Sequence, residues 1–443
     1  MMNLDWDAGG ADTETLVTDT RFPQIREVRN SIIALARLAA LADGATRVQL
    51  LNLWYIPGKS LRAVYRLEQG AAARDGQIWL LQFYAEGESA GAHAGAAARA
   101  ADPARVHHLP GWDAVAWHFP EDPGLPRLPS LVESASLRQR MAAVTDVAVP
   151  LSAAWRLLSY LPGERCTLRI DSGDASVVAK LSDPATAAAS HALSTRLWGL
   201  PGRRFILPRP LALEAREGVR WEAFVPGHQI ESGFASGDLG GLARRVAPAL
   251  TALHATPGAG LPDKGREQLL SRLRSKVLPR IMGAVAPAVP EAEALIADLE
   301  VAARALPPEA ADGLIHGDFH VANLLADGGD IIFLDLDSAG RGSPARDLAH
   351  FGGRLLLMAL VRGERLGDAA RAARELVDAY RASGGNAVSE DEFAWYMAAL
   401  LLAAQARTCI RHLAPGLQRL VPALLGIARR TLAQGRFDSS AVG

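Results

Sequence analysis

The residues best suited to chemistry lie in the last third of the chain. A His-Gly-Asp triplet ends at Asp318, an amide follows at Asn323, and a later apolar run ends at Asp335. Apolar residues at 324–325 and 331–334 flank an Asp-Gly-Gly-Asp turn, a pattern that predicts a β-hairpin. Because a hairpin folds back on itself, we expect the two carboxylates and the amide to meet at its open end.

Two kinds of chemistry could use such a set. Phosphoryl transfer needs a base that orients the attacking hydroxyl and two oxygen ligands that hold Mg²⁺ against the nucleotide phosphates. A hydrolase could instead bind a metal through the His-x-Asp-x-His pattern of His316, Asp318 and His320. Asn323 and Asp335 favour the first interpretation, because zinc prefers nitrogen and sulfur ligands. Each residue alone would more often be a turn or structural residue, so the prediction depends on the complete set.

The order and spacing of these residues resemble the aminoglycoside phosphotransferase and choline kinase group of small-molecule kinases. The signature of that group is HGD-x-x-x-x-N followed by a strand that ends in Asp, and it is matched here by His316-Gly-Asp318, Asn323 and Asp335. The resemblance implies that Asp318 is the catalytic base and that Asn323 and Asp335 are the metal ligands. It further implies that His316 and Asp347 support the catalytic loop, and that ATP and Mg²⁺ are the cofactors.

The bulk composition narrows the class of protein. With 47 Lys and Arg against 48 Asp and Glu, the 443-residue chain has no charge excess that would favour nucleic acid or a membrane surface. Two lone cysteines, Cys166 and Cys409, predict a reducing compartment. The longest apolar run, around 396–406, is shorter than a membrane span, and residues 1–15 lack the apolar core of a signal peptide. We therefore expect a soluble, cytoplasmic protein, and the sequence does not predict its oligomeric state.

A β-rich pattern occurs twice in the first half of the chain. Tyr-Ile-Pro-Gly at 55–58 and Tyr-Leu-Pro-Gly at 160–163 each lie between two predicted strands, and each copy continues into a third strand and an alanine-rich helix. This self-similarity predicts a duplicated β-lobe, although hairpins with Pro-Gly turns also resemble one another by chance. The third strand carries Gln82 in the first copy and Lys180 in the second. Because only the lysine can reach a phosphate as a positive charge, we predict that the second copy binds the nucleotide and that the first is an accessory lobe.

Three more positions in the second copy are predicted to contact the nucleotide. The turn at Gly163 could lie over the phosphates and offer its backbone N–H groups. The segment around Glu222 and Phe224 resembles the hinge of kinase-like folds, where backbone groups hydrogen-bond adenine. Side chains carry little of that recognition, so plain turn and strand residues are the alternative at all three positions.

One departure from the family pattern concerns Lys180. In the family, the helix after this lysine normally offers an acidic partner, but no Asp or Glu occurs between Asp183 and Glu214. Asp335 could orient the lysine instead. The missing partner favours an alternative function, a catalytically silent nucleotide-binding scaffold of the same fold, whereas the intact catalytic set opposes it. A protein kinase is a weaker interpretation, because the His-Arg-Asp, Asp-Phe-Gly and Ala-Pro-Glu landmarks are missing.

The chain after Asp347 is predicted to be almost wholly helical. In the family such helices form the floor of the acceptor site, so we consider four residues either as substrate contacts or as core and ion-pair residues: Trp395, Tyr396, Arg407 and Arg411. No acidic cluster suited to a polycationic aminoglycoside occurs between residues 353 and 443. From family breadth, we expect the acceptor to be a hydroxyl of a small polar metabolite, such as a sugar, amino sugar, aminoglycoside or amino alcohol.

The predicted architecture is an α+β, bilobal, protein-kinase-like fold with an extra N-terminal β-rich lobe and a large helical C-terminal lobe. The resemblance covers the chain from about residue 149 to its end. The expected regions are a polar tail, an accessory lobe, a nucleotide-binding β-lobe with the hinge, and a helical lobe with the catalytic loop and acceptor site, at 1–24, 25–148, 149–226 and 227–443.

Overall fold

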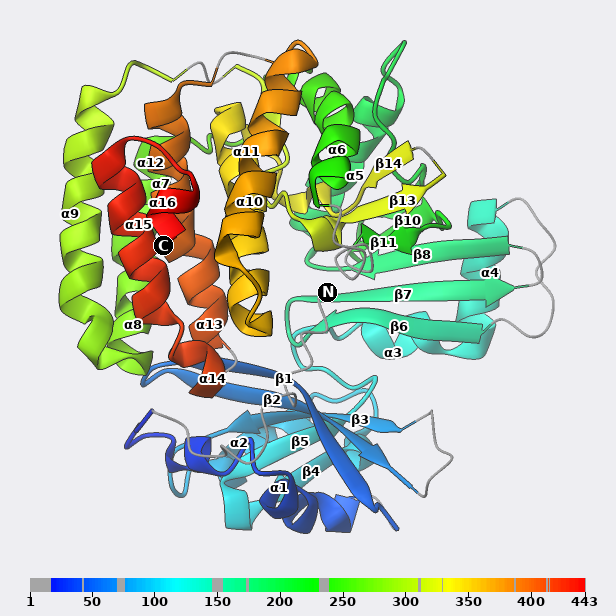
Figure 1. The fold of residues 1–443 in the computed structure, drawn as a ribbon. Coiled ribbons are helices and arrows are strands. Elements are labelled where there is room, and N and C mark those ends of the chain that lie inside the picture. The colour runs from blue at the N-terminus through cyan, green and yellow to red at the C-terminus, as the bar shows by residue number, and fades with distance from the viewer. Residues whose placement is uncertain are drawn as a thin grey trace.

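The computed structural model contains two β-rich lobes and one large helical lobe, which confirms the predicted mixed α+β architecture (Figure 1). The structure describes residues 17–41, 44–69, 76–145, 154–172, 175–230, 239–309, 312–328, 330–385, 388–411, 413 and 415–442. Most of the predicted N-terminal tail, and the boundary predicted at 148–149, lie outside these residues.

The first lobe is a five-stranded antiparallel sheet with the strand order β1-β2-β3-β5-β4. Its strands are β1 (Arg47–Ile56), β2 (Ser60–Glu68), β3 (Gln77–Phe83), β4 (Val106–Leu109) and β5 (Ala114–His118). The helices of this lobe are α1 (Ser31–Leu38) and α2 (Ser89–Ala97). The first begins at Ser31, because Asn30 caps the helix by accepting hydrogen bonds from the N–H groups of Ile32 and Ile33.

The second lobe has the equivalent strand order, β6-β7-β8-β10-β9. Its elements are β6 (Ala154–Leu161), β7 (Arg165–Ser172), β8 (Ala175–Leu181), α5 (Pro184–Trp198), β9 (Pro210–Glu214) and β10 (Val219–Ala223). In both lobes three consecutive strands lead into a helix, and the chain then returns through an edge strand to a fourth strand beside the third. The sequence pattern and the topology therefore repeat together.

Both lobes also fix their Pro-Gly turn in the same way. In each, one aspartate accepts hydrogen bonds from the hydroxyl of the turn tyrosine and from the N–H of the turn glycine. The distances are 2.7 Å from Tyr55 and 2.9 Å from Gly58 to Asp19 in the first lobe, and 2.7 Å from Tyr160 and 2.8 Å from Gly163 to Asp122 in the second. Because an ionised acceptor makes the stronger hydrogen bonds, each aspartate holds its turn firmly against the preceding segment.

Two helices between the lobes were not expected from the sequence. The residues of α3 (Leu128–Val132) and α4 (Ser134–Thr145) follow a proline-rich stretch that predicts a loop, but Pro129 lies in the first turn of α3, where a proline is tolerated. The edge strands β4 and β9 were also missed, and β9 begins with a proline, which a sheet accepts at its edge. An apolar core joins α3 and α4 to facing residues of both sheets.

The helical lobe carries the predicted hairpin. Its strands are β13 (Leu324–Asp327) and β14 (Asp330–Phe333), with Leu324 opposite Phe333 and the short strand β11 (His228–Gln229) beside β13. A second small sheet pairs β12 (Leu314–Ile315) with β15 (Gly340–Arg341). The principal helices are α6 (Leu239–His254), α7 (Arg266–Arg272), α8 (Leu278–Ala284), α9 (Val289–Ala305), α10 (Pro344–Arg362), α11 (Leu366–Ala382), α12 (Glu390–Leu400), α13 (Arg407–Arg411), α14 (Pro415–Gln418) and α15 (Val421–Gln434).

Two π-helical segments interrupt helices that were predicted to be regular. Segment η6 (Leu273–Val277) lies between α7 and α8, and segment η10 (Leu401–Ala406) lies between α12 and α13. The two segments pack against each other. Because π-helical insertions are rare and frequently lie at functional sites, we expect the place where these two segments meet to be close to a functional site.

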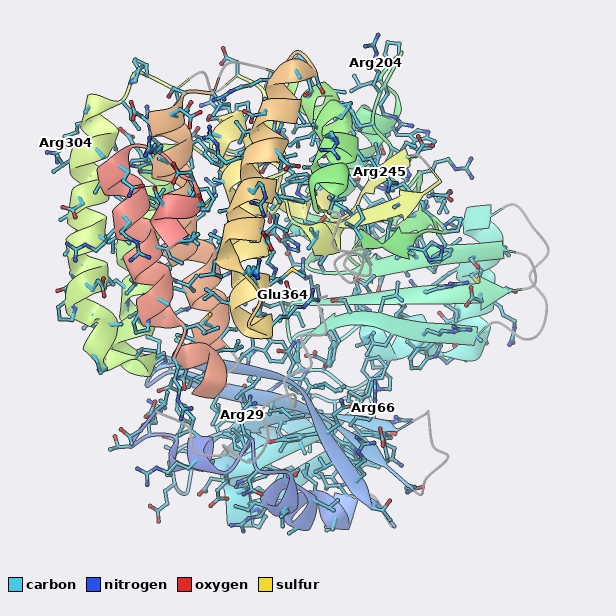
Figure 2. All side chains as sticks on the ribbon, viewed as in Figure 1. Arg29, Arg66, Arg204, Arg245, Arg304 and Glu364 are labelled. Carbon is cyan, nitrogen blue, oxygen red and sulfur yellow. The ribbon has the colours of Figure 1, made fainter. Side chains whose placement is uncertain are left out.

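The helical stretch from Glu390 to Arg411 is longer than the apolar run expected from the sequence. By length and composition alone it could cross a membrane, but 83% of its apolar 18-residue window is buried inside the protein. Such burial is typical of a core helix. Figure 2 shows side chains filling the space around this helix, whereas Arg304 projects from the outer side of α9.

Candidate active site

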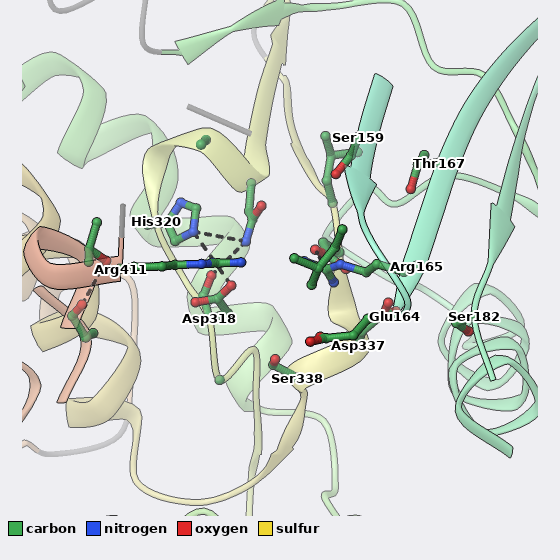
Figure 3. A pocket seen from close by; sticks show the side chains of 18 of the residues that line it. Ser159, Glu164, Arg165, Thr167, Ser182, Asp318, His320, Asp337, Ser338 and Arg411 are labelled. Carbon is green, nitrogen blue, oxygen red and sulfur yellow. Dashed lines mark hydrogen bonds and ion pairs between the residues drawn. The ribbon is translucent and has the colours of Figure 1, made fainter. Parts of the chain in front are cut away.

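The second sheet, the hairpin, the helical lobe and the first lobe together surround a cleft of about 1230 Å³. The predicted residues Lys180, Asp318, Asn323 and Asp335 all line it. Figure 3 shows Asp318 between two groups of side chains, with Arg165 on the side of the second sheet and Arg411 on the side of the helical lobe. The cleft thus contains a carboxylate at its centre and a different lobe on either side.

The open end of the hairpin places the predicted metal ligands. The N–H of Leu334 donates to the backbone oxygen of Asn323 at 2.9 Å, which continues the pairing of β13 with β14 to the residue before Asp335. Asp335 has a φ of 56°, a left-handed conformation that is unfavourable for an aspartate. The Nδ2 of Asn323 donates to the backbone oxygen of Asp318 at 2.9 Å, so its Oδ1 is the atom left for another partner. The fold therefore brings these three residues together.

These residues fit a magnesium ion that is shared with a nucleotide. Asp335 and Asn323 offer carboxylate and amide oxygens, which Mg²⁺ prefers, and Mg²⁺ usually takes only one or two protein ligands beside phosphate oxygens and water. In this structure, Oδ2 of Asp335 accepts a hydrogen bond from Nη1 of Arg165 at 3.4 Å. Among the described residues, no group of three His, Cys, Asp or Glu could hold a metal ion. This finding argues against the hydrolase-type His-x-Asp-x-His cluster considered from the sequence.

Asp347 holds the catalytic loop from below. This fully buried carboxylate, in the first turn of α10, accepts hydrogen bonds from the N–H groups of His316 at 2.6 Å and Gly317 at 2.9 Å. It also lies 3.1 Å from Nε2 of His254. Burial alone would raise the pKa of Asp347, but these partners outweigh it and hold the pKa below its usual value. At Gly317, which has a φ of 78°, a Cβ atom would lie 2.1 Å from the Ser338 carbonyl oxygen, so the loop requires glycine there.

His316 is placed as a structural residue. Its side chain is fully buried, and its Nε2 lies 2.9 Å from the backbone oxygen of Leu334. This contact ties the start of the catalytic loop to the end of β14. The imidazole therefore lies in the core of the helical lobe, against the rings of Phe319 and Phe333.

Asp318 lies between two histidines. The Nε2 atoms of His320 and His350 are each 3.7 Å from its carboxylate oxygens, and its side chain is 42% exposed to the cleft. Burial would raise the pKa of Asp318, but the histidines outweigh it and hold the pKa well below its usual value. The carboxylate is therefore ionised near neutral pH and can accept a hydrogen bond from a hydroxyl. The sequence analysis did not identify His350 as a site residue. Its position one helical turn after Asp347 could have indicated it.

Lys180 has an acidic partner that the sequence analysis did not find. Its Nζ lies 2.8 Å from Oε2 of Glu222, whose side chain is 8% exposed. Arg220 is opposite Lys180 in the pairing of β10 with β8, so Glu222, two residues further along β10, lies on the same face. The expectation of a missing partner was wrong because the partner is on the neighbouring strand and not on the following helix.

Buried Arg220 extends this network to the catalytic loop. Its guanidinium donates to Oδ1 of Asp337, and its Nε lies 3.8 Å from Glu222. Asp337 follows Asp335 by two residues. The second sheet is therefore tied directly to the segment that carries a predicted metal ligand, which limits how far the two sides of the cleft can separate.

The backbone N–H groups that were predicted to contact the nucleotide already donate hydrogen bonds within the protein. The N–H of Gly163 donates to Asp122, as described above, and the N–H groups of Ala223 and Phe224 donate to the backbone oxygens of Arg209 at 2.9 Å and Ser176 at 3.2 Å. The Phe224 ring packs under the guanidinium of Arg169, 3.8 Å from the ring centre. A phosphate contact through the Gly163 N–H therefore conflicts with this geometry, because that N–H already donates to the carboxylate of Asp122.

The four candidates for acceptor contact fall into two pairs. Trp395 and Tyr396 are fully buried, with the indole N–H donating to the backbone oxygen of Leu299 at 2.9 Å and the phenol donating to Glu309. They are core residues. Arg407 and Arg411 line the cleft instead.

Comparisons with known proteins place this site in a wider context. Residues 163–385 match the model of the phosphotransferase enzyme family. A choline/ethanolamine kinase family protein from Mesorhizobium loti is 17% identical, with a TM-score of 0.47 over 70% of this chain and 98% of that chain. An aminoglycoside phosphotransferase from Streptomyces rimosus is 21% identical, with a TM-score of 0.41 over 64% of this chain and 97% of that chain. A search of curated proteins found no match.

Proposed function

The chain belongs to the phosphotransferase enzyme family, and from that premise we propose that it transfers the γ-phosphoryl group of ATP to a hydroxyl of a small polar metabolite, with Mg²⁺. The observation that carries this proposal is the meeting of Asp318, Asn323 and Asp335 in one cleft, opposite Lys180. We further propose that the protein acts in the cytoplasm, where ATP and small metabolites are available.

Each of these residues has a part in the proposed reaction. Ionised Asp318 accepts a hydrogen bond from the acceptor hydroxyl and aims its oxygen at the γ-phosphorus. A new P–O bond forms there, the bond to ADP breaks, and the hydroxyl proton passes to Asp318 or to solvent. Asn323 and Asp335 would hold Mg²⁺, which neutralises charge on the phosphates. Lys180, held by Glu222, offers a fixed positive charge to the same phosphates.

The structure weakens the case for a silent scaffold. That alternative depended on an unpartnered Lys180, and the ion pair with Glu222 removes this argument. The unfavourable backbone conformation of Asp335 also fits a catalytic role, because strained residues persist mainly where function requires them.

The test uses Asp318→Asn and Asp335→Ala in an assay of acceptor-dependent ADP release. We expect each to lower kcat/KM by roughly 10²- to 10⁴-fold. Asp318→Asn should keep the rise in Tm caused by Mg²⁺ and ATP, whereas Asp335→Ala should lose most of it. Asp330→Ala is the matched control, because this exposed carboxylate lies at the opposite end of β14. Unchanged turnover in either active-site variant would sink the proposal.

A further inference from the structure

The side of the cleft formed by the helical lobe is rich in arginine. Four of its lining arginines are half-buried and come from α7, α8 and α13: Arg272, Arg280, Arg407 and Arg411. The packed π-helical segments η6 and η10 lie directly next to Arg272 and Arg407. Residues more than a hundred positions apart in the sequence are thereby gathered at one place.

Among the described residues, these four arginines have no directly paired carboxylate, although the more distant charges of Glu164 and Asp318 act on Arg280, Arg407 and Arg411. Other cleft residues, such as Lys180, do have a directly paired carboxylate. Burial, together with the charges of Arg272, Arg280 and Arg411, lowers the pKa of Arg407 to about 10, and the charge of Asp318 acts in the opposite direction. Because half-buried charges without partners destabilise the folded state, the cluster has a cost that a bound anion would offset.

Buried polar groups in the same region are also unpartnered. Gln405 is 1% exposed, and neither its Nε2 nor its Oε1 has a hydrogen-bond partner among the described residues. The Nε of Arg407 and the indole Nε1 of Trp54 are likewise buried without a partner there. All three side chains line the cleft. Native buried polar groups nearly always have partners, so such a group of donors indicates a place where a ligand or ordered water binds.

The first lobe completes this wall of the cleft. Trp54 of β1 lies under the guanidinium of Arg411, which is 5.6 Å from its ring centre. The turn after β1 is seated on α8, because a Cβ atom at Gly283 would lie 1.9 Å from Pro57. The first lobe therefore contributes directly to the region between Asp318 and the arginines.

From this geometry we propose that the phosphoryl acceptor itself carries a phosphate or carboxylate group, which Arg407 and Arg411 bind together with Gln405 and Trp54. The inference rests on the proposed function. The charges of Arg407 and Arg411 are both close enough to interact with Asp318. A small hydroxylated anion could therefore present its hydroxyl to Asp318 while its charged group contacts the arginines. A polycation would instead be repelled.

The first experiment compares matched acceptors with the full chain, Mg²⁺ and ATP. One series is glycerol, glycerate and glycerol 3-phosphate, and another is glucose, glucosamine, gluconate and glucose 6-phosphate. We expect ADP release with anionic members and at least ten-fold less with the neutral or cationic members. A preference for the neutral or cationic members overturns the inference and leaves the proposed function intact.

The second experiment measures binding without turnover. The Tm of the full chain is recorded with inorganic phosphate or chloride at equal ionic strength, in the presence of Mg²⁺ and a non-hydrolysable ATP analogue that occupies the nucleotide side. Phosphate should raise the Tm of the wild type and of the control Arg304→Gln, which changes an exposed arginine on α9 (Figure 2). It should raise the Tm of Arg407→Gln and Arg411→Gln much less, with the apparent Kd weaker by roughly 10- to 100-fold.

The same variants separate a binding role from a structural one. Because removing one of several neighbouring half-buried positive charges relieves repulsion, Arg407→Gln without phosphate should have a Tm equal to or above that of the wild type. A lower Tm, or an undiminished phosphate effect, overturns the inference. If the ATP analogue fails to raise the Tm of any variant, the proposed function fails, whereas the phosphate response still tests the arginines.

Discussion

The two β-lobes have the same scaffold but different chemistry. Both have five strands in equivalent order, and both hold a Pro-Gly turn with one aspartate that accepts from a tyrosine and a glycine. They differ on the third strand. Lys180 of the second lobe pairs with Glu222 and faces the catalytic loop, whereas Gln82 of the first accepts a hydrogen bond from Arg62 at 2.8 Å.

The two copies also differ in their position in the molecule. The second lobe lies across the cleft from Asp318, so a lysine there can act on a nucleotide. The outer strand and turn of the first lobe pack against the helical lobe, where Trp54 and Pro57 contact Arg411 and Gly283. The scaffold fixes strands and turns, and the docking surface decides what they can bind.

The largest expected effect on activity comes from giving the second lobe the glutamine that the first lobe has on its third strand. Lys180→Gln should lower kcat/KM by about 100-fold, because a fixed positive charge at the phosphates is lost. Lys180→Arg should restore part of the activity. The measurement is steady-state ADP release with ATP varied.

A stability control accompanies that variant. Lys180→Gln leaves the carboxylate of Glu222 buried with a weaker partner, so its Tm should fall, and the double variant Lys180→Gln/Glu222→Gln should recover stability without activity. Wild-type turnover in the double variant would contradict the proposed role of Lys180.

A smaller effect is expected at the turns. Asp122→Asn should cost about 1.5–3 kcal/mol of unfolding free energy, because a buried carboxylate that accepts hydrogen bonds from Tyr160 and Gly163 is lost. Asp19→Asn, at the more exposed equivalent turn, should cost about 0.5–1.5 kcal/mol. Urea unfolding measures both. Both turns line the cleft, but only Asp122→Asn should also raise the KM for ATP, since its turn belongs to the lobe that carries Lys180.

The pH dependence of stability tests whether Asp19 stabilises the protein through its ionised carboxylate. Burial would raise the pKa of this carboxyl, but hydrogen bonds from Gly58, Tyr55 and neighbouring N–H groups hold the pKa below its usual value. Its stabilising contribution is therefore fully present above the unfolded pKa, near 4, and is lost as the pH falls through the folded pKa. The difference in unfolding free energy between Asp19→Asn and the wild type should become smaller below about pH 4. A difference independent of pH would refute the assignment.

The smallest effect is expected from giving the first lobe a lysine. Gln82→Lys breaks one hydrogen bond with Arg62 and should change the unfolding free energy by about 1 kcal/mol or less. It should not add a second ATP site, because no catalytic loop faces it. Calorimetric titration with Mg²⁺ and ATP would show unchanged stoichiometry, and two bound nucleotides would disprove the positional argument.

The chemistry of the catalytic loop could be predicted because its parts are close in sequence. Asp318 and Asn323 lie just before one hairpin and Asp335 just after it, and turn residues and apolar spacing determine how a hairpin pairs. The repeated Tyr-x-Pro-Gly turns likewise indicated two similar lobes. The short edge strands β4 and β9 were missed, because four or five residues carry too little periodic pattern to identify a strand.

By itself the sequence indicated the candidate reacting residues, their order, and the contrast between Gln82 and Lys180. Only the tertiary structure decided that Glu222 pairs with Lys180, that His350 faces Asp318, and that arginines from three helices line the same cleft as Trp54 of the first lobe. The physical reason is the distance along the chain between the residues that interact. Local patterns are set by backbone geometry over a few residues, whereas charges far apart in sequence become neighbours only when packed elements bring them together.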